Sequence, residues 1–418
     1  MHFFNYKGNE LYAEDVPVRM LAEKYGTPLY IYSYKTLLRH FKAYDEAYKS
    51  YPHVVCYAVK ANTSRAILRL LAKNGGGADI VSGGELFRAM NAGISPKKIV
   101  YAGVGKTEHE IRYALKAGIM MFNVESEQEL LEIDRVAADM KVRAPIALRI
   151  NPNIDPKTHP YISTGMKKNK FGIPIQNAIE NYKLAAGLKN IEVVGIHKHI
   201  GSQITEISPF VDALKRILIL LDELHSRKFN IKYLDIGGGL GIPYLDEKPP
   251  KPSELAKNLL SLINKRKITL IMEPGRSIVG NAGILVAKTL YLKKGAGKNF
   301  IIVDAGMNDL MRPSLYDAYH HIIPVVRNRR ANIKADIVGP ICESGDFLAK
   351  DRKIQKIYQG EYLSVMSAGA YGISMSSNYN SRPAAAEVMV NGRSHSIIRE
   401  RGTYEDLIKD ERVPSYLR

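Results

Sequence analysis

From residue 54 onward the chain alternates between apolar, strand-like runs and amphipathic segments. The amphipathic segments have the period of a helix, as in Ser64–Lys73, Glu85–Ala92, Glu108–Ala117 and Glu127–Met140. The strand-like runs lie at 54–60, 78–82, 98–102, 120–124, 145–150, 191–199, 231–236 and 268–273. Eight parallel strand–helix units over roughly 220 residues predict an α/β fold of the (β/α)8 barrel type, with an open doubly wound sheet as the alternative.

The two ends of the chain differ from the central region in their sequence pattern. Residues 1–14 predict a short strand pair around Lys7-Gly8-Asn9. Past residue 283 the sequence is rich in β runs and turns, and helical periodicity is clear only near 312–320. We therefore expect an N-terminal segment (1–30) that joins a β domain, a barrel (31–282) and a C-terminal β-barrel or sandwich domain (283–418).

Composition narrows the class of protein. Hydrophobic residues make up 45% and charged residues 24%, as in ordinary globular proteins. The two cysteines, Cys56 and Cys342, provide neither a disulfide framework nor a metal-ligand spacing, so we expect a cytoplasmic protein without a metal site. No signal peptide and no apolar run of membrane-spanning length is recognisable, so no membrane partner is expected.

The net charge of +18 raises the question of nucleic-acid binding. The basic clusters are Lys167-Lys168-Asn169-Lys170 and Arg327-Asn328-Arg329-Arg330, and neither is interleaved with aromatic residues as in a nucleic-acid module. We interpret both as solvated faces and expect no nucleic-acid partner. A basic field would also attract an anionic substrate or cofactor.

Residues that could act in catalysis or binding lie at the predicted strand ends, where barrel enzymes place their active sites. They are Lys60 at the first strand, Asp79 and Ser82 at the second, Arg149 and Asn151 at the fifth, His197, His199 and Gly201-Ser202-Gln203 at the sixth, Gly237-Gly238-Gly239-Leu240-Gly241 at the seventh, and Glu273-Pro274-Gly275-Arg276 at the eighth.

Lys60 ends an apolar, β-branched run that starts at Val54. A lysine at the end of a buried strand is expected to have a lowered pKa and to become nucleophilic, as Schiff-base lysines require. The alternative is a lysine whose stem is buried while its amine reaches water.

Three further features point to one cofactor. Glycines let backbone N–H groups approach a phosphate, although the run at 237–241 could equally be a tight turn. Glu273 could hold a pyridine nitrogen protonated or pair with Arg276, and His199 could stack on a planar ring or bind structurally. Together with Lys60, these features suggest pyridoxal 5'-phosphate.

The motifs resemble a known family. Tyr57-Ala58-Val59-Lys60-Ala61-Asn62, the His199–Gln203 segment, the glycine run and Glu273-Pro274-Gly275-Arg276 are similar to those of the fold-type III pyridoxal phosphate-dependent decarboxylases. Three C-terminal stretches resemble the diaminopimelate decarboxylase branch of that family: 304–316 (Asp304-Ala305-Gly306 to Tyr316), Cys342-Glu343-Ser344-Gly345-Asp346 and Ala368-Gly369-Ala370-Tyr371.

The resemblance implies an alanine-racemase-like barrel that binds pyridoxal phosphate. Lys60 would carry the cofactor covalently, His199 would stack on its ring, and Glu273 would bind its nitrogen. The remaining cofactor-binding residues would be Asp79, Ser82, Ser202, Gly237, Gly238, Gly239, Gly275, Arg276 and Tyr371.

The resemblance also implies the substrate and the assembly. Meso-2,6-diaminopimelate would be decarboxylated to L-lysine, with its distal carboxylate bound by Arg276, Arg312 and Tyr316 and its distal ammonium by Glu343. Tyr371 would be a further substrate-binding residue. Cys342 would donate a proton from the partner subunit of a homodimer with shared active sites. His159–Phe171 would be an active-site lid.

The sequence leaves related functions open. Decarboxylases of the same family act on ornithine, arginine or carboxynorspermidine, which lack one of the two distal groups. Amino-acid racemisation on the same barrel and non-catalytic binding of the cofactor are also compatible with the barrel motifs. The long β region from 283 onward argues against both of these.

Overall fold

The computed structural model describes residues 2–155, 170–263, 266–295 and 297–418. The chain divides into two compact units. One consists of Leu38–Ile278, and the other of Met1–Leu37 together with Val279–Arg418. The predicted starts of the barrel at 31 and of the C-terminal domain at 283 lie close to this division, but residue 31 falls inside a strand of the second unit.

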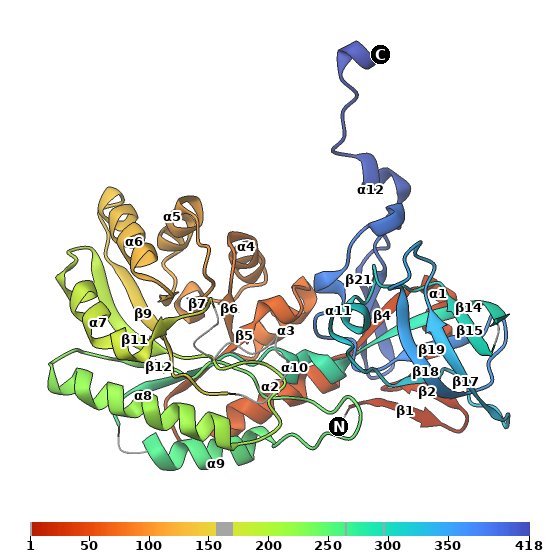
Figure 1. Cartoon of the computed structure of the whole chain (residues 1–418), viewed down its shortest axis with the longest axis horizontal. Coiled ribbons are helices and arrows are strands. Elements are labelled where there is room, and N and C mark those ends of the chain that lie inside the picture. The colour runs from red at the N-terminus through yellow and green to blue at the C-terminus, as the bar shows by residue number, and fades with distance from the viewer. Residues whose placement is uncertain (1, 156–169, 264–265, 296) are drawn as a thin grey trace. The chain divides into compact units, whose positions relative to one another are not determined.

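The first unit is a closed parallel barrel (Figure 1). Its strands are β5 (His53–Ala58), β6 (Gly77–Ile80), β7 (Ile99–Tyr101), β8 (Met121–Val124), β9 (Ala144–Asn151), β11 (Ile191–His197), β12 (Tyr233–Asp235) and β13 (Thr269–Met272). The pairing of β8 with β9 and of β13 with β5 closes the circle, and β10 (Ile173–Pro174) adds to β9. The prediction of a (β/α)8 barrel is confirmed, and the open sheet is excluded.

Helices flank the barrel strands (Figure 1). Local capping explains where several begin: Thr107 and Glu110 form a capping box, and the Ser126 hydroxyl accepts a hydrogen bond from the backbone of Glu129. The helices are α2 (Tyr34–Tyr48), α3 (Arg65–Lys73), α4 (Gly83–Asn91), α5 (Glu108–Ala117), α6 (Glu127–Asp139), α7 (Ala178–Gly187), α8 (Ser208–Ser226), α9 (Pro252–Ile263) and the short α10 (Arg276–Val279).

The barrel strands are buried almost throughout, because helices cover them outside and side chains fill them inside. Cys56, Val100, Met121 and Ile271 come from different strands and pack into one apolar cluster. Cys56 is therefore a core residue. Since apolar residues fill this part of the interior, the polar residues at the strand ends stand out as candidates for function.

The second unit is built mainly from β-strands. Its large sheet has the order β18-β17-β15-β14-β4-β20-β21, and β19 pairs with both β14 and β16. These strands are β4 (Leu29–Ser33), β14 (Gly283–Gly295), β15 (Lys298–Val303), β16 (Ile322–Pro324), β17 (Asn332–Val338), β18 (Phe347–Gln355), β19 (Tyr362–Val365), β20 (Ala386–Asn391) and β21 (Ser394–Arg399).

The N-terminal segment completes this unit, as predicted. β4 lies between β14 and β20 in the large sheet, and β1 (Phe4–Lys7), β2 (Glu10–Ala13) and β3 (Val16–Pro17) form a small sheet. The unit also contains α1 (Val18–Tyr25), α11 (Arg312–Tyr316) and α12 (Tyr404–Ile408). Within the described ranges, no helix is both long and apolar enough to cross a membrane.

Candidate active site

Glu273 directly follows β13 and is the centre of a buried polar cluster in the barrel. Its Oε2 lies 3.4 Å from Nε2 of His197, and its Oε1 accepts a hydrogen bond from Nδ2 of Asn123 at 3.3 Å. Burial by itself would raise the pKa of the Glu273 carboxyl, but His197 and the Lys60 ammonium outweigh it and hold the pKa below its usual value. Glu273 is therefore ionised at neutral pH.

Asp235 ends β12 beside this carboxylate and behaves in the opposite way. Burial and the adjacent charge of Glu273 raise the pKa of Asp235 well above its usual value. Its oxygens lie 2.9 Å from the backbone N of Gly237 and 3.2 Å from Nδ2 of Asn123. Two neighbouring buried carboxyl groups rarely both ionise, so Asp235 carries the proton and Glu273 the charge.

Of the two alternatives for Lys60, the side chain's exposure is closer to that of a lysine with a buried stem and an accessible amine. β5 ends at Ala58, so Lys60 lies in a short 3-10 turn, Val59–Ala61, and 36% of its side chain is exposed. Its Nζ lies 2.6 Å from Oδ2 of Asp79, which is fully buried. Burial and repulsion by Glu273 raise the pKa of Asp79 to about 7, against the opposing effect of Lys60.

Lys198, between the two histidines in the sequence, is a described lysine that is completely buried. Its side chain is fully buried, and its Nζ has no hydrogen-bond partner among the described residues. Nζ lies 5.6 Å from the centroid of the Phe210 ring. Burial lowers the pKa of Lys198 to about 8, although Asp235 and Glu273 oppose the shift.

His199 follows β11 and is fixed by the glycine run. The backbone N–H of Gly238 donates to Nδ1 of His199 at 3.1 Å, so the ring proton lies on Nε2. Burial lowers the pKa of His199 well below its usual value, and the ring is neutral at neutral pH. This leaves a neutral imidazole in a fixed orientation close to Glu273, 4.0 Å from Nδ1 to Oε2.

The glycines of this run are required by close packing. A Cβ at Gly238 would lie 2.1 Å from the carbonyl oxygen of Glu273. Gly237 has φ +66°, and a Cβ there would lie 2.6 Å from the carbonyl oxygen of Lys198. The backbone after β12 thus passes directly between the ends of β11 and β13, which leaves no space for side chains.

Arg276 begins α10 and is bound to the segment after β11. Its Nε and Nη2 donate to Oγ of Ser202 at 3.3 and 3.1 Å, and Nη1 donates to the hydroxyl of Tyr244 at 2.7 Å. Gly275 packs tightly on the Lys60 turn, where its Cβ would lie 3.0 Å from Cβ of Ala61. A guanidinium, a hydroxyl and backbone N–H groups are the donors that a phosphate needs.

Some of the predicted site residues make structural contacts within the barrel unit. Ser82 caps α4, where its hydroxyl accepts a hydrogen bond from the backbone of Glu85 at 3.2 Å. Arg149 pairs with Glu125 at 2.7 Å, and Glu125 also accepts the backbone N–H of Gly172 at 3.2 Å. Most of the predicted lid, His159–Phe171, lies outside the described residues.

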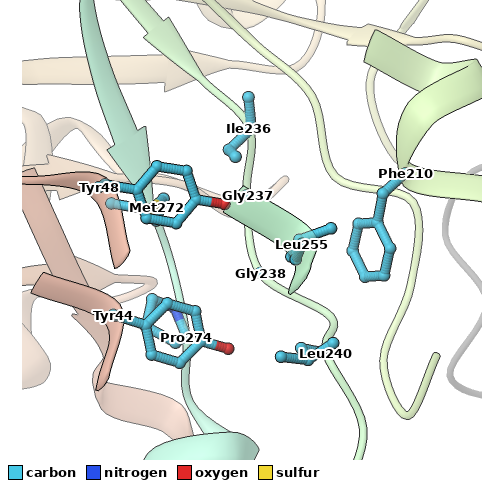
Figure 2. Close-up of a pocket in the computed structure, with 10 residues that line it drawn as sticks. All are labelled: Tyr44, Tyr48, Phe210, Ile236, Gly237, Gly238, Leu240, Leu255, Met272 and Pro274. Atoms are coloured by element: carbon cyan, nitrogen blue, oxygen red, sulfur yellow. The ribbon is translucent and has the colours of Figure 1, made fainter. Parts of the chain in front are cut away.

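A small cavity lies behind the glycine run (Figure 2). Tyr44 and Tyr48 of α2 face it from one side and Phe210 of α8 from the other. Gly237 and Gly238 line it, together with Ile236, Leu240, Leu255, Met272 and Pro274. The lining is mostly apolar, so this cavity is distinct in character from the polar cluster around Glu273.

The predicted substrate residues lie in the β unit. Arg312 and Tyr316 are both in α11, and the Arg312 guanidinium lies 5.9 Å from the centroid of the Tyr316 ring. The hydroxyl of Ser314, in the same helix, donates to the carbonyl oxygen of Gly345 at 2.6 Å. This bond connects α11 to the segment that carries Cys342 and Glu343.

Cys342 and Glu343 are exposed on this unit. The backbone N–H of Cys342 donates to Oδ1 of Asn380 at 2.7 Å, and the Tyr379 hydroxyl donates to Oε2 of Glu343 at 3.2 Å. Tyr371 is half-buried and has φ +55°, a left-handed conformation that is unusual for a bulky residue. Such backbone outliers occur often at functional sites.

Asp346 connects the loop that contains Met307 to the loop that carries Cys342 and Glu343, and the sequence predicts no functional role for it. Its Oδ1 accepts the backbone N–H of Met307 and its Oδ2 that of Ile341, each at 2.7 Å. Burial raises its pKa above the usual value. Asn123 was also missed, although a polar residue within the apolar run Met121–Val124 was a usable signal.

The barrel residues fit pyridoxal phosphate. An ionised carboxylate, a neutral fixed imidazole, an accessible lysine and a glycine-lined cradle beside Arg276 and Ser202 are the groups that this cofactor needs. Residues 34–280 match the family described as "Pyridoxal-dependent decarboxylase, pyridoxal binding domain". The barrel and its site thus define a pyridoxal phosphate-dependent decarboxylase.

Individual relatives narrow this class. A diaminopimelate decarboxylase of Aquifex aeolicus is 53% identical over 408 residues, which are 97% of this chain and 97% of that protein. One of Vibrio cholerae is also 53% identical over 96% of each chain. A solved diaminopimelate decarboxylase from M. jannaschii in complex with L-lysine has a TM-score of 0.95, 41% identity and 99% coverage of both chains.

This chain belongs to the diaminopimelate decarboxylase family. The family and the cofactor predicted from the motifs are confirmed.

Proposed function

We propose that this protein decarboxylates meso-2,6-diaminopimelate to L-lysine and carbon dioxide, the last step of lysine biosynthesis. The observation that carries this proposal is identity of about one half, over nearly the full length, to relatives that are named for this reaction. Decarboxylation of ornithine, arginine or carboxynorspermidine is the competing hypothesis that the assay must exclude.

In the barrel, the chain's own residues would bind and orient the cofactor. Bound pyridoxal phosphate supplies a conjugated ring that accepts the electron pair left when the α-carboxylate departs. We assign Lys60 as its covalent attachment point, with Asp79 orienting the amine. Glu273, kept ionised, would hold the ring nitrogen protonated, and His199 would stack on the ring.

The phosphate would bind at the glycine run. Gly237, Gly238 and Gly239 let the backbone approach a phosphate without side chains in the way, and Gly275 and Arg276 lie after the adjacent strand. The N–H groups of Gly237 and Gly238 already bind Asp235 and His199, so the run would contribute close approach more than these two donors. Ser202 would bind the phosphate beside Arg276. The hydrogen bond between the two side chains places the Ser202 hydroxyl next to the guanidinium. Ser82 and Tyr371 remain proposed cofactor contacts on the family resemblance alone.

The β unit would recognise the far end of the substrate. A guanidinium binds a carboxylate in a bidentate manner, so we assign Arg312, with Tyr316, to the distal carboxylate. Arg276 and Tyr371 would assist, and Glu343 would bind the distal ammonium. A substrate that carries both groups at its far end is a diamino diacid.

We further propose a cytoplasmic homodimer with shared active sites. Cys342 and Glu343 are exposed on the β unit, which supports their delivery to a site in the partner subunit. Cys342 would then donate a proton to the reacting carbon. The two compact units would be the two domains of each subunit.

The test is carbon dioxide release from meso-diaminopimelate, with ornithine, arginine, lysine and carboxynorspermidine in parallel and the product identified by chiral chromatography. Selective release with L-lysine as product supports the proposal. Release only from ornithine, arginine or carboxynorspermidine would refute the assignment of the substrate. A racemised product without carbon dioxide would refute the reaction.

A pair of lysine variants tests the cofactor assignment separately. Lys60→Ala is expected to lose the visible absorbance of the covalently bound cofactor, because its amine is removed. Lys198→Met is the matched control, since it removes a nearby lysine that is fully buried. Absorbance that survives in Lys60→Ala and disappears in Lys198→Met would show that Lys198 is the attachment point.

A further inference from the structure

His320 lies directly behind Arg312 in the β unit and is completely buried. Nε of Arg312 donates to Nε2 of His320 at 3.4 Å. On its other side, Nδ1 of His320 lies 2.9 Å from the carbonyl oxygen of Met366. Arg312 itself is 6% exposed, so both partners of this contact are shielded from water.

The two contacts fix the protonation of the ring. Nε2 can accept from Arg312 only if it carries no proton, and Nδ1 can bind a carbonyl oxygen only if it carries one. A neutral imidazole with its proton on Nδ1 satisfies both bonds. The carbonyl of Met366 therefore orients the ring, and the ring in turn orients the guanidinium.

The consequence for Arg312 is geometric. A guanidinium is a planar fork, and a bond at Nε fixes the rotation of that plane. Bidentate binding of a carboxylate then uses the edge formed by Nη1 and Nη2. Met366 also lies just before the segment that carries Tyr371, so the same imidazole connects two segments with proposed substrate residues.

We infer that His320 is a positioning residue that sets the preference for a substrate with a distal carboxylate by holding the Arg312 guanidinium. This inference rests on the proposed function and extends it to a residue that does not itself touch the substrate. It applies to the distal carboxylate alone, and it leaves cofactor binding and the reacting carbon unaffected.

Two substitutions separate the contacts of His320. In His320→Asn the amide occupies the place of Nδ1, so the contact with Met366 is kept and the acceptor for Arg312 is lost. In His320→Gln the longer amide reaches the place of Nε2, so the acceptor for Arg312 is kept. A purely structural role would make the loss of the Met366 contact at least as harmful as the loss of the Arg312 contact.

The readout is competitive inhibition of the holoenzyme by L-lysine and by cadaverine, which lacks the carboxylate. We expect His320→Asn to raise the inhibition constant of L-lysine and the KM for meso-diaminopimelate about tenfold, as loss of one charge-assisted hydrogen bond does. Inhibition by cadaverine and kcat should stay within about twofold. His320→Gln should stay within about threefold of the unsubstituted enzyme in all four measurements.

Several results would overturn the inference. They are unchanged inhibition by L-lysine in His320→Asn, equal weakening of L-lysine and cadaverine, or a larger loss in His320→Gln. Comparing Arg312→Lys with the double variant Arg312→Lys/His320→Asn adds an independent check. Lysine has no guanidinium Nε for His320 to bind, so His320→Asn should have no further effect in that background. If the unsubstituted enzyme releases no carbon dioxide from meso-diaminopimelate, the proposed function and this inference both fail.

Discussion

Replacing Lys198 by methionine is expected to stabilise the protein. The side chain is fully buried, and its Nζ finds no hydrogen-bond acceptor among the described residues. Burying an uncompensated ammonium costs free energy, whereas methionine has a similar length and no charge. The substitution should therefore remove a cost without leaving a large cavity.

The pKa of Lys198 gives the magnitude. A fall from 10.5 to about 8 corresponds to a cost on the order of 3 kcal/mol for the charged form at neutral pH. The contact between Nζ and the Phe210 ring, at 5.6 Å, offsets about 1 kcal/mol of it. The expected gain at pH 7 is thus about 2 kcal/mol in the free energy of unfolding. This corresponds to a rise in Tm of about 2 °C if the whole chain unfolds together and about 4 °C if the barrel unit unfolds by itself.

The gain should depend on pH in a defined direction. Between pH 8 and pH 10.5 the unfolded chain binds the proton that folded Lys198 has already lost, so the stability of the unsubstituted protein rises with pH there. The advantage of Lys198→Met should consequently be largest below pH 8 and shrink toward pH 10.5.

Thermal unfolding followed by circular dichroism, at pH 7, 8, 9 and 10, measures this difference with cofactor bound. Lys215→Met is the matched control, since Lys215 is exposed on α8, and it should change neither Tm nor its pH dependence. A folded Lys198→Met protein that is no more stable than the unsubstituted one at pH 7 would refute the reasoning.

Three further predictions concern the barrel and the β unit. Gly238→Ala would place a Cβ 2.1 Å from the Glu273 carbonyl oxygen, so cofactor affinity, measured by absorbance titration, should fall at least about tenfold; Gly105→Ala, whose Cβ meets nothing within 4 Å, should be neutral. Asp346→Ala removes the acceptor of two backbone N–H groups and should cost about 2–4 kcal/mol in unfolding by urea, whereas an unchanged midpoint would contradict that role. Because burial raises the pKa of Asp79 from 3.8 to about 7, its ionisation opposes folding as pH rises through that range; Asp79→Asn should flatten the fall in Tm between pH 4 and 7, and an unaltered slope would contradict it.

The sequence predicts the barrel well because its signal is local and repeated. Each unit combines an apolar run with an amphipathic segment, and closure by the β8–β9 pair follows from having eight of them. The β unit is predicted less completely, since β4 lies far in sequence from its partners β14 and β20. Long-range pairing of that kind has no local signature.

The same distinction applies to the candidate site. Strand-end position is enough to select Glu273 and His199, because the barrel brings strand ends together. It does not decide burial: the apolar run before Lys60 is compatible with a buried or an accessible amine, and the end of the strand at Ala58 and the following turn leave the side chain partly exposed. Lys198 is a fully buried lysine among the described residues, and it lies between two histidines that are themselves stronger candidates by residue type.

The charge of the polar cluster follows from competition among its acids. Asp79, Asp235 and Glu273 are all buried, and three adjacent negative charges would be prohibitively costly in a low-dielectric interior. Since Glu273 has His197, Asn123 and Lys60 to stabilise its charge, the repulsion raises the pKa of the two aspartates instead. The cluster therefore concentrates one negative charge on the residue that we propose for the ring nitrogen. Removing Asn123 or His197 would redistribute that charge among the acids, which makes both residues determinants of the proposed cofactor site. The sequence selects His197 by its strand-end position but does not select Asn123, which lies within an apolar strand.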